Sequence, residues 1–362
     1  MNFDDIRPYT DAELPAALAR IGSQPVLAQI IKFVYPKSDI KLEIERLMAV
    51  RTVHEFQSTF MNDAIKRIIA STTDGFTFSG INHLRRKGNY LFVSNHRDIT
   101  LDAFLLQHLL LEQKGDTSYI IFGDNLLSMP AAADLFRCNK LVSMSRGGTP
   151  RAFYNSLQHL SQYIHQLVVE ERQSIWIAQK NGRAKDGIDT TAPAIIKMLA
   201  LGGEKPPLET LADLHLVPMS ISYEWDPCDA MKANELFLGG KGKYDKAPNE
   251  DLTSVVTGIV GHKGRVHLHI GVPLTPAELQ PAEGEDLFEH VSALLDHRIR
   301  RGYYLMPSNY AAYDMLKGTN RYRHYYTAAT TRQLQQRQQQ LADDERRQIL
   351  LQTYANPVIQ IQ

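Results

Sequence analysis

The sequence has little cysteine, no long apolar run and no excess of charge of either sign. Cys138 and Cys228 are the only cysteines among 362 residues, too few for a disulfide framework or a cysteine-based zinc site. No window reaches eighteen uninterrupted apolar residues, so the sequence predicts no membrane-spanning helix. The basic residues number 40 and the acidic residues also 40, a balance that argues against a nucleic-acid partner.

The first residues are acidic and do not form the apolar core of a signal peptide. Together with the low cysteine content, this favours a protein of the reducing cytoplasm, one that reaches membranes only from their surface. A chain of 362 residues can bury a sizeable core. One large domain with an appendage is therefore expected.

Three regions differ in their residue pattern. Residues 1–75 carry apolar side chains at helical spacing, as in Leu14, Leu18 and Ile21, and are predicted to form a helical N-terminal region. Residues 76–300 alternate short apolar runs with amphipathic stretches. Residues 301–362 combine a basic, tyrosine-rich segment with a glutamine-rich helix, expected at about 328–353 as a peripheral tail.

The alternation in the middle region predicts an α/β domain, with a central mostly parallel or mixed sheet flanked by helices. The N-terminal helices would form an appendage to it and the glutamine-rich helix a C-terminal helical tail. The expected strands are 77–80, 89–94, 118–123, 140–144, 174–178, 214–222 and 264–271. The expected helices lie near 100–113, 125–136, 150–171, 192–201 and 285–300. Pro218 interrupts its strand and so predicts a sheet edge or a strand start there.

A histidine and an aspartate follow the second expected strand. His96 lies on the loop that leaves the strand, and Asp102 falls in the first turn of a helix that Thr100 would cap. A carboxylate that holds one ring nitrogen of a histidine leaves the other nitrogen free to accept a proton. The pair could therefore serve as a general base. Seen alone, it fits a buried structural histidine at least as well.

Two glycine-containing loops also follow strands and carry basic side chains. In residues 145–151, two glycines and a Thr149-Pro150 helix start are flanked by Arg146 and Arg151, a pattern that suits a phosphate-binding helix start. In residues 179–187, the cations Arg183 and Lys185 lie between two glycines. From spacing alone, both loops could equally be solvated turns.

These stretches, in this order, resemble the glycerolipid acyltransferase superfamily, which includes glycerol-3-phosphate acyltransferases and lysophosphatidic acid acyltransferases. The first motif of that family, Asn-His-x4-Asp, is matched by Asn95-His96 with Asp102. The second and third, both Arg-containing, are matched by Arg146 to Arg151 and by Gly182 to Gly187. The fourth, an apolar Val/Ile-Pro strand, is matched by Val217-Pro218. The resemblance covers roughly residues 75 to 300.

This chain departs from the family pattern at two places. The spacing from His96 to its aspartate is one residue longer, so either the loop bulges before the helix or Asp98 orients the histidine; we favour Asp102. Where the third motif usually carries Glu, this chain has Gln179, Lys180 and Asn181. The loss of that carboxylate leaves open a protein that binds lipid without turning it over.

The resemblance implies an O-acyltransferase of phospholipid biosynthesis. The donor would be an acyl thioester on coenzyme A or acyl carrier protein, and the acceptor a hydroxyl of glycerol 3-phosphate or of a lysophospholipid. His96 would be the general base, oriented by Asp102. The phosphate of the acceptor would be bound by Arg146, Arg151, Arg183 and Lys185. The resemblance implies neither a metal ion nor a cofactor.

Two rival functions stay open, a catalytically silent lipid-binding or scaffold protein and an O-acyltransferase with a non-phosphate lipid acceptor. For each of them, as for the enzyme, we expect a membrane surface as a partner. The segment from Arg298 to Tyr326 interleaves arginines with tyrosines and suits a lipid headgroup region, although it could also pack onto the core. The expected location is peripheral, on the inner face of the cell membrane.

Overall fold

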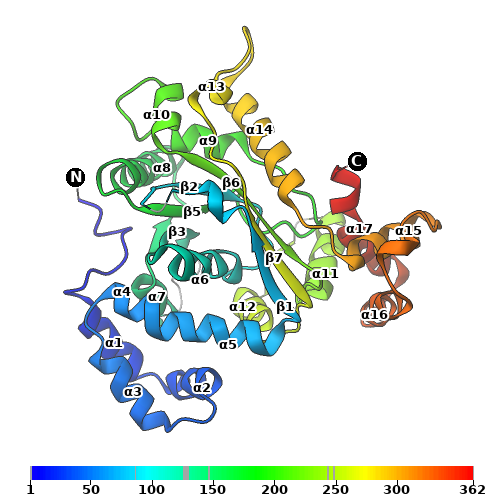
Figure 1. Cartoon of the computed structure of the whole chain (residues 1–362), viewed down its shortest axis with the longest axis horizontal. Helices are drawn as coiled ribbons and strands as arrows, with labels where there is room; N and C mark the ends of the chain where they lie inside the picture. The colour runs from blue at the N-terminus through cyan, green and yellow to red at the C-terminus, as the bar shows by residue number, and fades with distance from the viewer. Residues whose placement is uncertain are drawn as a thin grey trace.

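The computed structural model describes residues 2–85, 87–124, 130–145, 147–242, 244–247 and 249–361, and gives no side-chain detail for residues 130–132. At its centre is a seven-stranded sheet in the order β1-β7-β6-β2-β5-β3-β4 (Figure 1). Each of the seven predicted strands is present. Their bounds are β1 Gly75–Ser79, β2 Leu91–Ser94, β3 Ser118–Gly123, β4 Leu141–Met144, β5 Ser174–Ala178, β6 Leu216–Tyr223 and β7 Arg265–Ile270.

The sheet is mixed, as the alternation of strands and helices predicted. Every neighbouring pair runs parallel except β6 and β7, which are antiparallel. Side chains alternate between its two faces, so that Phe92 enters one apolar core while Leu91 and Val93 enter the other. Both faces are therefore covered.

Helices from different parts of the chain cover the two faces (Figure 1). From α5 onward, the helices that contribute buried side chains to the first core are α5 Asn62–Thr72, α6 Leu101–Lys114, α7 Pro130–Cys138 and α12 Glu250–Val260. The second core is closed by α8 Pro150–His165, α9 Pro193–Leu199, α10 Pro207–Asp213, α13 Pro276–Leu279 and α14 Leu287–Gly302. Sequence reasoning had not predicted α10, α12 or α13.

The N-terminal region is helical, as its apolar spacing predicted. The helices that precede α5 are α1 Leu14–Gly22, α2 Pro25–Val34, α3 Ile40–Ala49 and α4 Val53–Phe56. Their buried side chains, such as Leu18, Ile31 and Leu47, join the first core. Figure 1 shows α1, α2 and α3 together at one end of the molecule.

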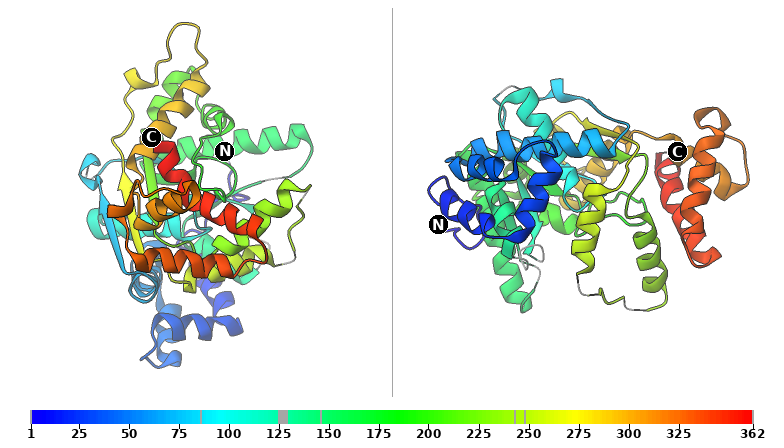
Figure 2. Two further views of the ribbon diagram at one scale, coloured as in Figure 1. Left: turned by 90° about the vertical axis from the view of Figure 1, so that its right-hand side faces the viewer. Right: turned by 90° about the horizontal axis from the view of Figure 1, so that it is seen from below.

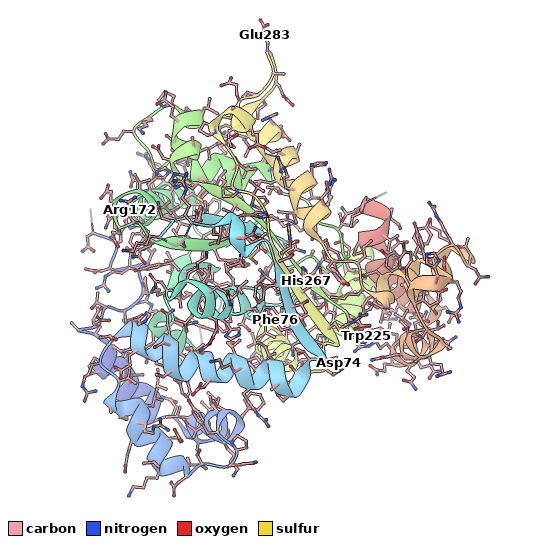
Figure 3. All side chains as sticks on the ribbon, viewed as in Figure 1. Asp74, Phe76, Arg172, Trp225, His267 and Glu283 are labelled. Carbon is pink, nitrogen blue, oxygen red and sulfur yellow. The ribbon has the colours of Figure 1, made fainter. Side chains whose placement is uncertain are left out.

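The C-terminal helices form a third core at the opposite end (Figures 1 and 2). This unit consists of α15 Pro307–Lys317, α16 Ala328–Gln339 and α17 Asp344–Ile361, packed against α11 Asp229–Gly240. Trp225, labelled in Figure 3, packs its ring 5.9 Å from that of Tyr354 on α17. The end of β6 is thus connected to the last helix of the chain.

The expected single helix at 328–353 is wrong, because the chain makes two helices there. Asp343 accepts a hydrogen bond from the backbone N–H of Arg346 and so starts a second helix at Asp344. Nor is α17 peripheral, since Leu350, Leu351 and Tyr354 are buried in the third core. The apolar residues in this polar segment were too sparse to show a helical stripe.

Pro218 lies in the middle of β6, which is an internal strand, so the expectation of an edge or strand start is wrong. The ladder between β6 and β7 begins only at Met219, paired with Ile270. Beyond it, Gly271 donates its N–H to the Pro218 carbonyl at 2.8 Å. The proline therefore lies beside the point where β7 ends, and its missing N–H breaks no bond of that ladder.

Candidate active site

The candidate site lies where β2, β5 and β6 end. Asn95 follows β2 and bonds across to β6: its Nδ2 donates to the Ile221 carbonyl at 3.1 Å, and its Oδ1 accepts from the Ile221 N–H at 2.8 Å. These two bonds continue the pairing of β2 with β6 through a side chain. They fix the start of the loop that carries His96.

His96 and Asp102 are hydrogen-bonded, with 2.8 Å between His96 Nδ1 and Asp102 Oδ2. Both residues are buried, and the ring centroids of His96 and Trp176 lie 5.4 Å apart in an edge-to-face arrangement. A carboxylate at Nδ1 favours the tautomer that carries its proton there. The lone pair is then on Nε2, for which no hydrogen-bond partner occurs among the described residues.

Asp102 is held by three further donors. Its Oδ2 also accepts from the backbone N–H groups of Arg97 at 2.6 Å and Asp98 at 3.0 Å. Its Oδ1 accepts from the hydroxyl of Tyr223 at 2.9 Å. Burial and then the nearby Asp102 raise the pKa of Tyr223 well above its usual value, so this phenol stays a donor. The carboxylate that faces His96 is thereby fixed in position.

Asp98, the alternative partner for His96, has a different role. Its Oδ1 accepts from the backbone N–H groups of Thr100 and Leu101, both at 2.9 Å, so Asp98 caps the start of α6. The side chain of Thr100, the expected cap, makes no capping bond. The extra residue between His96 and Asp102 is thus accommodated in a turn that Asp98 closes.

Arg183 lies beside this loop. The N–H of Ala184 donates to the His96 carbonyl at 2.8 Å, which joins the third motif to the first. Burial and then Asp102 raise the pKa of Asp98, while the positive charge of nearby Arg183 opposes that shift. Nη1 of Arg183 is buried and has no hydrogen-bond partner among the described residues. A cation with an unused donor therefore lies near His96.

The other predicted phosphate-binding residues are placed differently. Lys185 forms an ion pair with Glu235 on α11. Arg151 is exposed in the first turn of α8, whose predicted N-cap is present because Thr149 accepts from the Ala152 N–H at 3.3 Å. Arg146 lies outside the described residues. Among the described members of this set, Arg183 is the one that directly precedes the residue bonded to the His96 carbonyl.

Two residues of the site escaped sequence reasoning, Tyr223 as the partner of Asp102 and Lys232. The Lys232 side chain is 2% exposed; its Nζ donates to the Arg97 carbonyl at 2.7 Å and pairs with Asp226. It thus holds the loop next to His96 from α11. No local pattern marks either residue, because the groups that they hold in the site, Asp102 and the Arg97 carbonyl, lie more than a hundred residues away.

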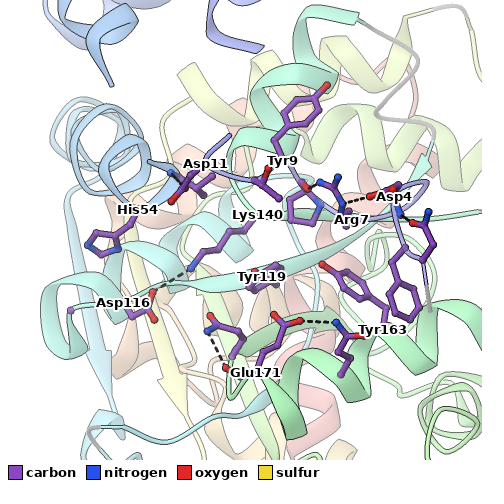
Figure 4. A pocket seen from close by; sticks show the side chains of 18 residues that line it. Asp4, Arg7, Tyr9, Asp11, His54, Asp116, Tyr119, Lys140, Tyr163 and Glu171 are labelled. Atoms are coloured by element: carbon purple, nitrogen blue, oxygen red, sulfur yellow. Dashed lines mark hydrogen bonds and ion pairs between the residues drawn. The ribbon is translucent and has the colours of Figure 1, made fainter. Parts of the chain in front are cut away.

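A separate cavity of about 810 Å³ lies where β3 and β4 begin, at the other end of the parallel strands from His96 (Figure 4). Tyr119 near the start of β3, Lys140 just before β4 and the N-terminal arm around Arg7 line it. Lys140 approaches Asp116 at 3.3 Å. His96, Arg151, Arg183 and Lys185 do not line this cavity.

Among the described residues, no helix is long and apolar enough to cross a membrane. The same part of the chain contains no group of three or more His, Cys, Asp or Glu side chains placed to hold a metal ion.

Comparison with known proteins gives one family. Residues 75–222 match the family model of acyltransferases. No curated protein matches the sequence significantly. Among solved structures, the chain is similar to the 1-acyl-sn-glycerophosphate acyltransferase of Thermotoga maritima, with 15% identity and a TM-score of 0.39. That alignment covers 81% of this chain and 94% of the other.

Proposed function

Because residues 75–222 match the family model of acyltransferases, we propose that this protein moves a fatty acyl group from an acyl thioester to a lipid-precursor hydroxyl. The donor is an acyl group on coenzyme A or acyl carrier protein, and the acceptor is glycerol 3-phosphate or a lysophospholipid. The observation that carries the proposal is the contact of Asp102 with His96 Nδ1. It leaves Nε2 free to accept a proton.

In the proposed reaction, the acceptor hydroxyl gives its proton to His96 Nε2 as its oxygen attacks the thioester carbonyl. The tetrahedral intermediate then expels the thiolate, which takes that proton and leaves as the thiol. Asp102 stabilises the imidazolium that forms between these steps. The acyl group passes directly from sulfur to oxygen, so no residue is acylated and no cofactor takes part.

Arg183 is the residue best placed to bind the acceptor phosphate, since its unused Nη1 donor lies near the His96 loop. A charge-assisted bond to phosphate would satisfy this donor. Arg151 in the first turn of α8, and Arg146 before that helix in the sequence, would add positive charge. Lys185 would contribute only after release from Glu235.

The ion pair between Lys185 and Glu235 favours a second candidate function, acyl transfer to a non-phosphate lipid acceptor. If Lys185 stays paired with Glu235, one of the four predicted cations is neutralised. A catalytically silent lipid-binding protein is less well supported, because the contact between His96 and Asp102 is intact.

We also propose that the protein works at a membrane surface. In the basic, tyrosine-rich segment, Arg301, Arg321 and Arg323 are exposed, and Tyr304 and Tyr325 are 51% and 50% exposed. Cations beside amphipathic aromatics complement the anionic headgroup region. Arg298 and Arg300 are not among the proposed membrane-binding residues, since Arg298 pairs with Glu278, and Arg300 with Asp296.

The test is purified protein with labelled acyl-coenzyme A or acyl carrier protein and a panel of acceptors, with products identified by mass. The panel contains glycerol 3-phosphate, lysophosphatidate, a lysophospholipid and a non-phosphate monoacylglycerol. We expect an ester product that contains phosphate and that disappears with His96→Ala. Product from the monoacylglycerol alone would establish the second candidate. No product from any acceptor, with either donor, would overturn the enzyme.

A further inference from the structure

The loop that carries Arg183 is held by the last helix of the chain, far outside the residues that match the acyltransferase family. Residues 185–189 form neither helix nor strand, so their carbonyl groups need partners from elsewhere. Side chains of α17 supply three of these contacts. Figures 1 and 2 show α17 packed between α15 and the body of the domain.

Three residues on successive turns of α17 contact this loop. Thr353 Oγ1 donates to the Lys185 carbonyl at 3.4 Å, and Asn356 Nδ2 donates to the Asp186 carbonyl at 2.6 Å. Gln360 Oε1 accepts from the Asp189 N–H at 2.9 Å, while its Nε2 donates to the Asp189 carbonyl at 3.4 Å. The side-chain amide of Gln360 thus bonds both backbone groups of Asp189.

Helix α17 approaches the loop so closely that it restricts which residue can occupy position 187. A Cβ on Gly187 would lie 2.2 Å from the Thr353 carbonyl oxygen, and the φ of Gly187 is +76°. Only glycine permits both this conformation and this contact without strain. The sharp turn after Arg183 and the position of α17 therefore depend on each other.

The other end of the same loop is tied to the catalytic histidine. The Ala184 N–H donates to the His96 carbonyl at 2.8 Å. Arg183 therefore directly precedes Ala184, which is bonded to His96, and lies two residues before Lys185, the first residue that contacts α17. A shift of α17 would reach Arg183 along two or three residues of chain from Lys185 and Asp186, and along six from Asp189.

We propose that Asn356 and Gln360 are positioning residues that hold the third-motif loop so that Arg183 can bind the acceptor phosphate. This inference rests on the proposed function. It makes the C-terminal helix part of the acceptor site although no α17 side chain touches the reacting atoms. Weakening either contact lowers affinity for the acceptor and leaves the donor site and the chemical step unchanged.

Two amide-to-acid substitutions separate hydrogen bonding from packing. In Asn356→Asp the donor to the Asp186 carbonyl is lost at nearly constant shape, whereas Gln360→Glu keeps an oxygen that accepts from the Asp189 N–H. We expect Asn356→Asp and Gln360→Ala to raise the acceptor KM about threefold to tenfold, with kcat and donor KM unchanged. Gln360→Glu keeps the acceptor for the Asp189 N–H but loses the donor to the Asp189 carbonyl, so its acceptor KM should lie between those of the parent and Gln360→Ala. Gln335→Ala, an exposed glutamine on α16, is the matched control.

A double-mutant cycle with Arg183 tests whether α17 changes the acceptor KM through this arginine. If α17 acts through this arginine, Gln360→Ala adds no further rise in acceptor KM when Arg183→Ala is already present. Fully additive effects in folded variants would overturn the proposal, as would an unchanged acceptor KM in both Asn356→Asp and Gln360→Ala.

Limited trypsin digestion gives a readout that needs no activity. Lys180, Arg183 and Lys185 are cleavage sites within the loop. We expect Asn356→Asp and Gln360→Ala to be cut there several times faster than the parent and the control, under conditions where all stay folded by circular dichroism. Equal cleavage rates overturn the positioning role. If the parent acylates no acceptor, the proposed function fails, and digestion alone still decides whether α17 holds the loop.

Discussion

Tyr223 and His96 hold Asp102 from opposite oxygens, with the Tyr223 hydroxyl 2.9 Å from Oδ1 and His96 Nδ1 2.8 Å from Oδ2. Tyr223 ends β6, and His96 follows β2, its parallel neighbour. The sheet itself therefore sets the orientation of the carboxylate relative to the imidazole.

Removing the Tyr223 hydroxyl should slow the reaction without abolishing it. In Tyr223→Phe, Asp102 keeps its two backbone donors and loses one hydrogen bond, so kcat should fall about threefold to tenfold. The acceptor KM should stay within about twofold. Steady-state kinetics on the folded variant checks both values, and a loss as large as that of His96→Ala would give the phenol a direct catalytic part.

Three substitutions test the proposed roles of His96 and Asp102. We expect His96→Ala to lower kcat by about 10²-fold or more and Asp102→Asn to lower it strongly, because base catalysis is lost or the wrong tautomer is favoured. Asp98→Asn keeps an oxygen that can cap α6 and should be much milder. Normal turnover by folded His96→Ala would exclude the mechanism, and a severe loss in Asp98→Asn would transfer the orienting role to Asp98.

The cations of the site should differ in importance. Arg183→Ala removes a charge-assisted contact of about 1.5 to 3 kcal/mol, so the acceptor KM should rise about tenfold or more while the donor KM barely changes. Lys185→Ala should have a smaller effect, since Lys185 is already paired with Glu235. The reverse order, measured with glycerol 3-phosphate, would show that the acceptor displaces Glu235 and binds Lys185.

Membrane binding should depend on the exposed arginines of the C-terminal segment. Each basic residue near an anionic leaflet contributes about 1 kcal/mol, an attraction that salt weakens. Changing Arg301, Arg321 and Arg323 together to glutamine should reduce sedimentation with anionic vesicles at low salt. The matched variant changes the exposed lysines Lys37, Lys41 and Lys87 to glutamine. A loss in that variant alone would transfer the contact to the N-terminal half of the chain.

Neither cysteine should take part in acyl transfer. Burial raises the pKa of the Cys138 thiol to about 12 and that of Cys228 to about 11, and both are almost fully buried. At pH 8 both remain protonated and unreactive. We expect iodoacetamide to label native protein slowly, unfolded protein completely, and to leave activity intact. Rapid labelling with loss of activity would indicate an acyl-cysteine intermediate.

Sequence reasoning predicted the sheet well, because short apolar runs such as Leu91–Ser94 can be recognised locally. It failed at Pro218, where the position at which β7 ends decides what the strand tolerates. For the candidate site, the family resemblance singled out His96, Asp102 and Arg183, whose catalytic and binding roles stay predictions. It missed Lys232, and Asn356 and Gln360, because each acts through a contact between distant segments that leaves no periodic pattern.

The pairing of β1 with β7 also affects how this chain is made. Among the described strands, β1 lies at the edge of the sheet and pairs with β7 alone, with Thr77 and His267 separated by 190 residues. At a synthesis rate of roughly 5–20 residues per second, β1 leaves the ribosome about 10 to 40 s before its partner exists. During that interval an unpaired strand is exposed to other chains. Newly made protein should therefore need chaperones, and truncation before residue 265 should give insoluble product.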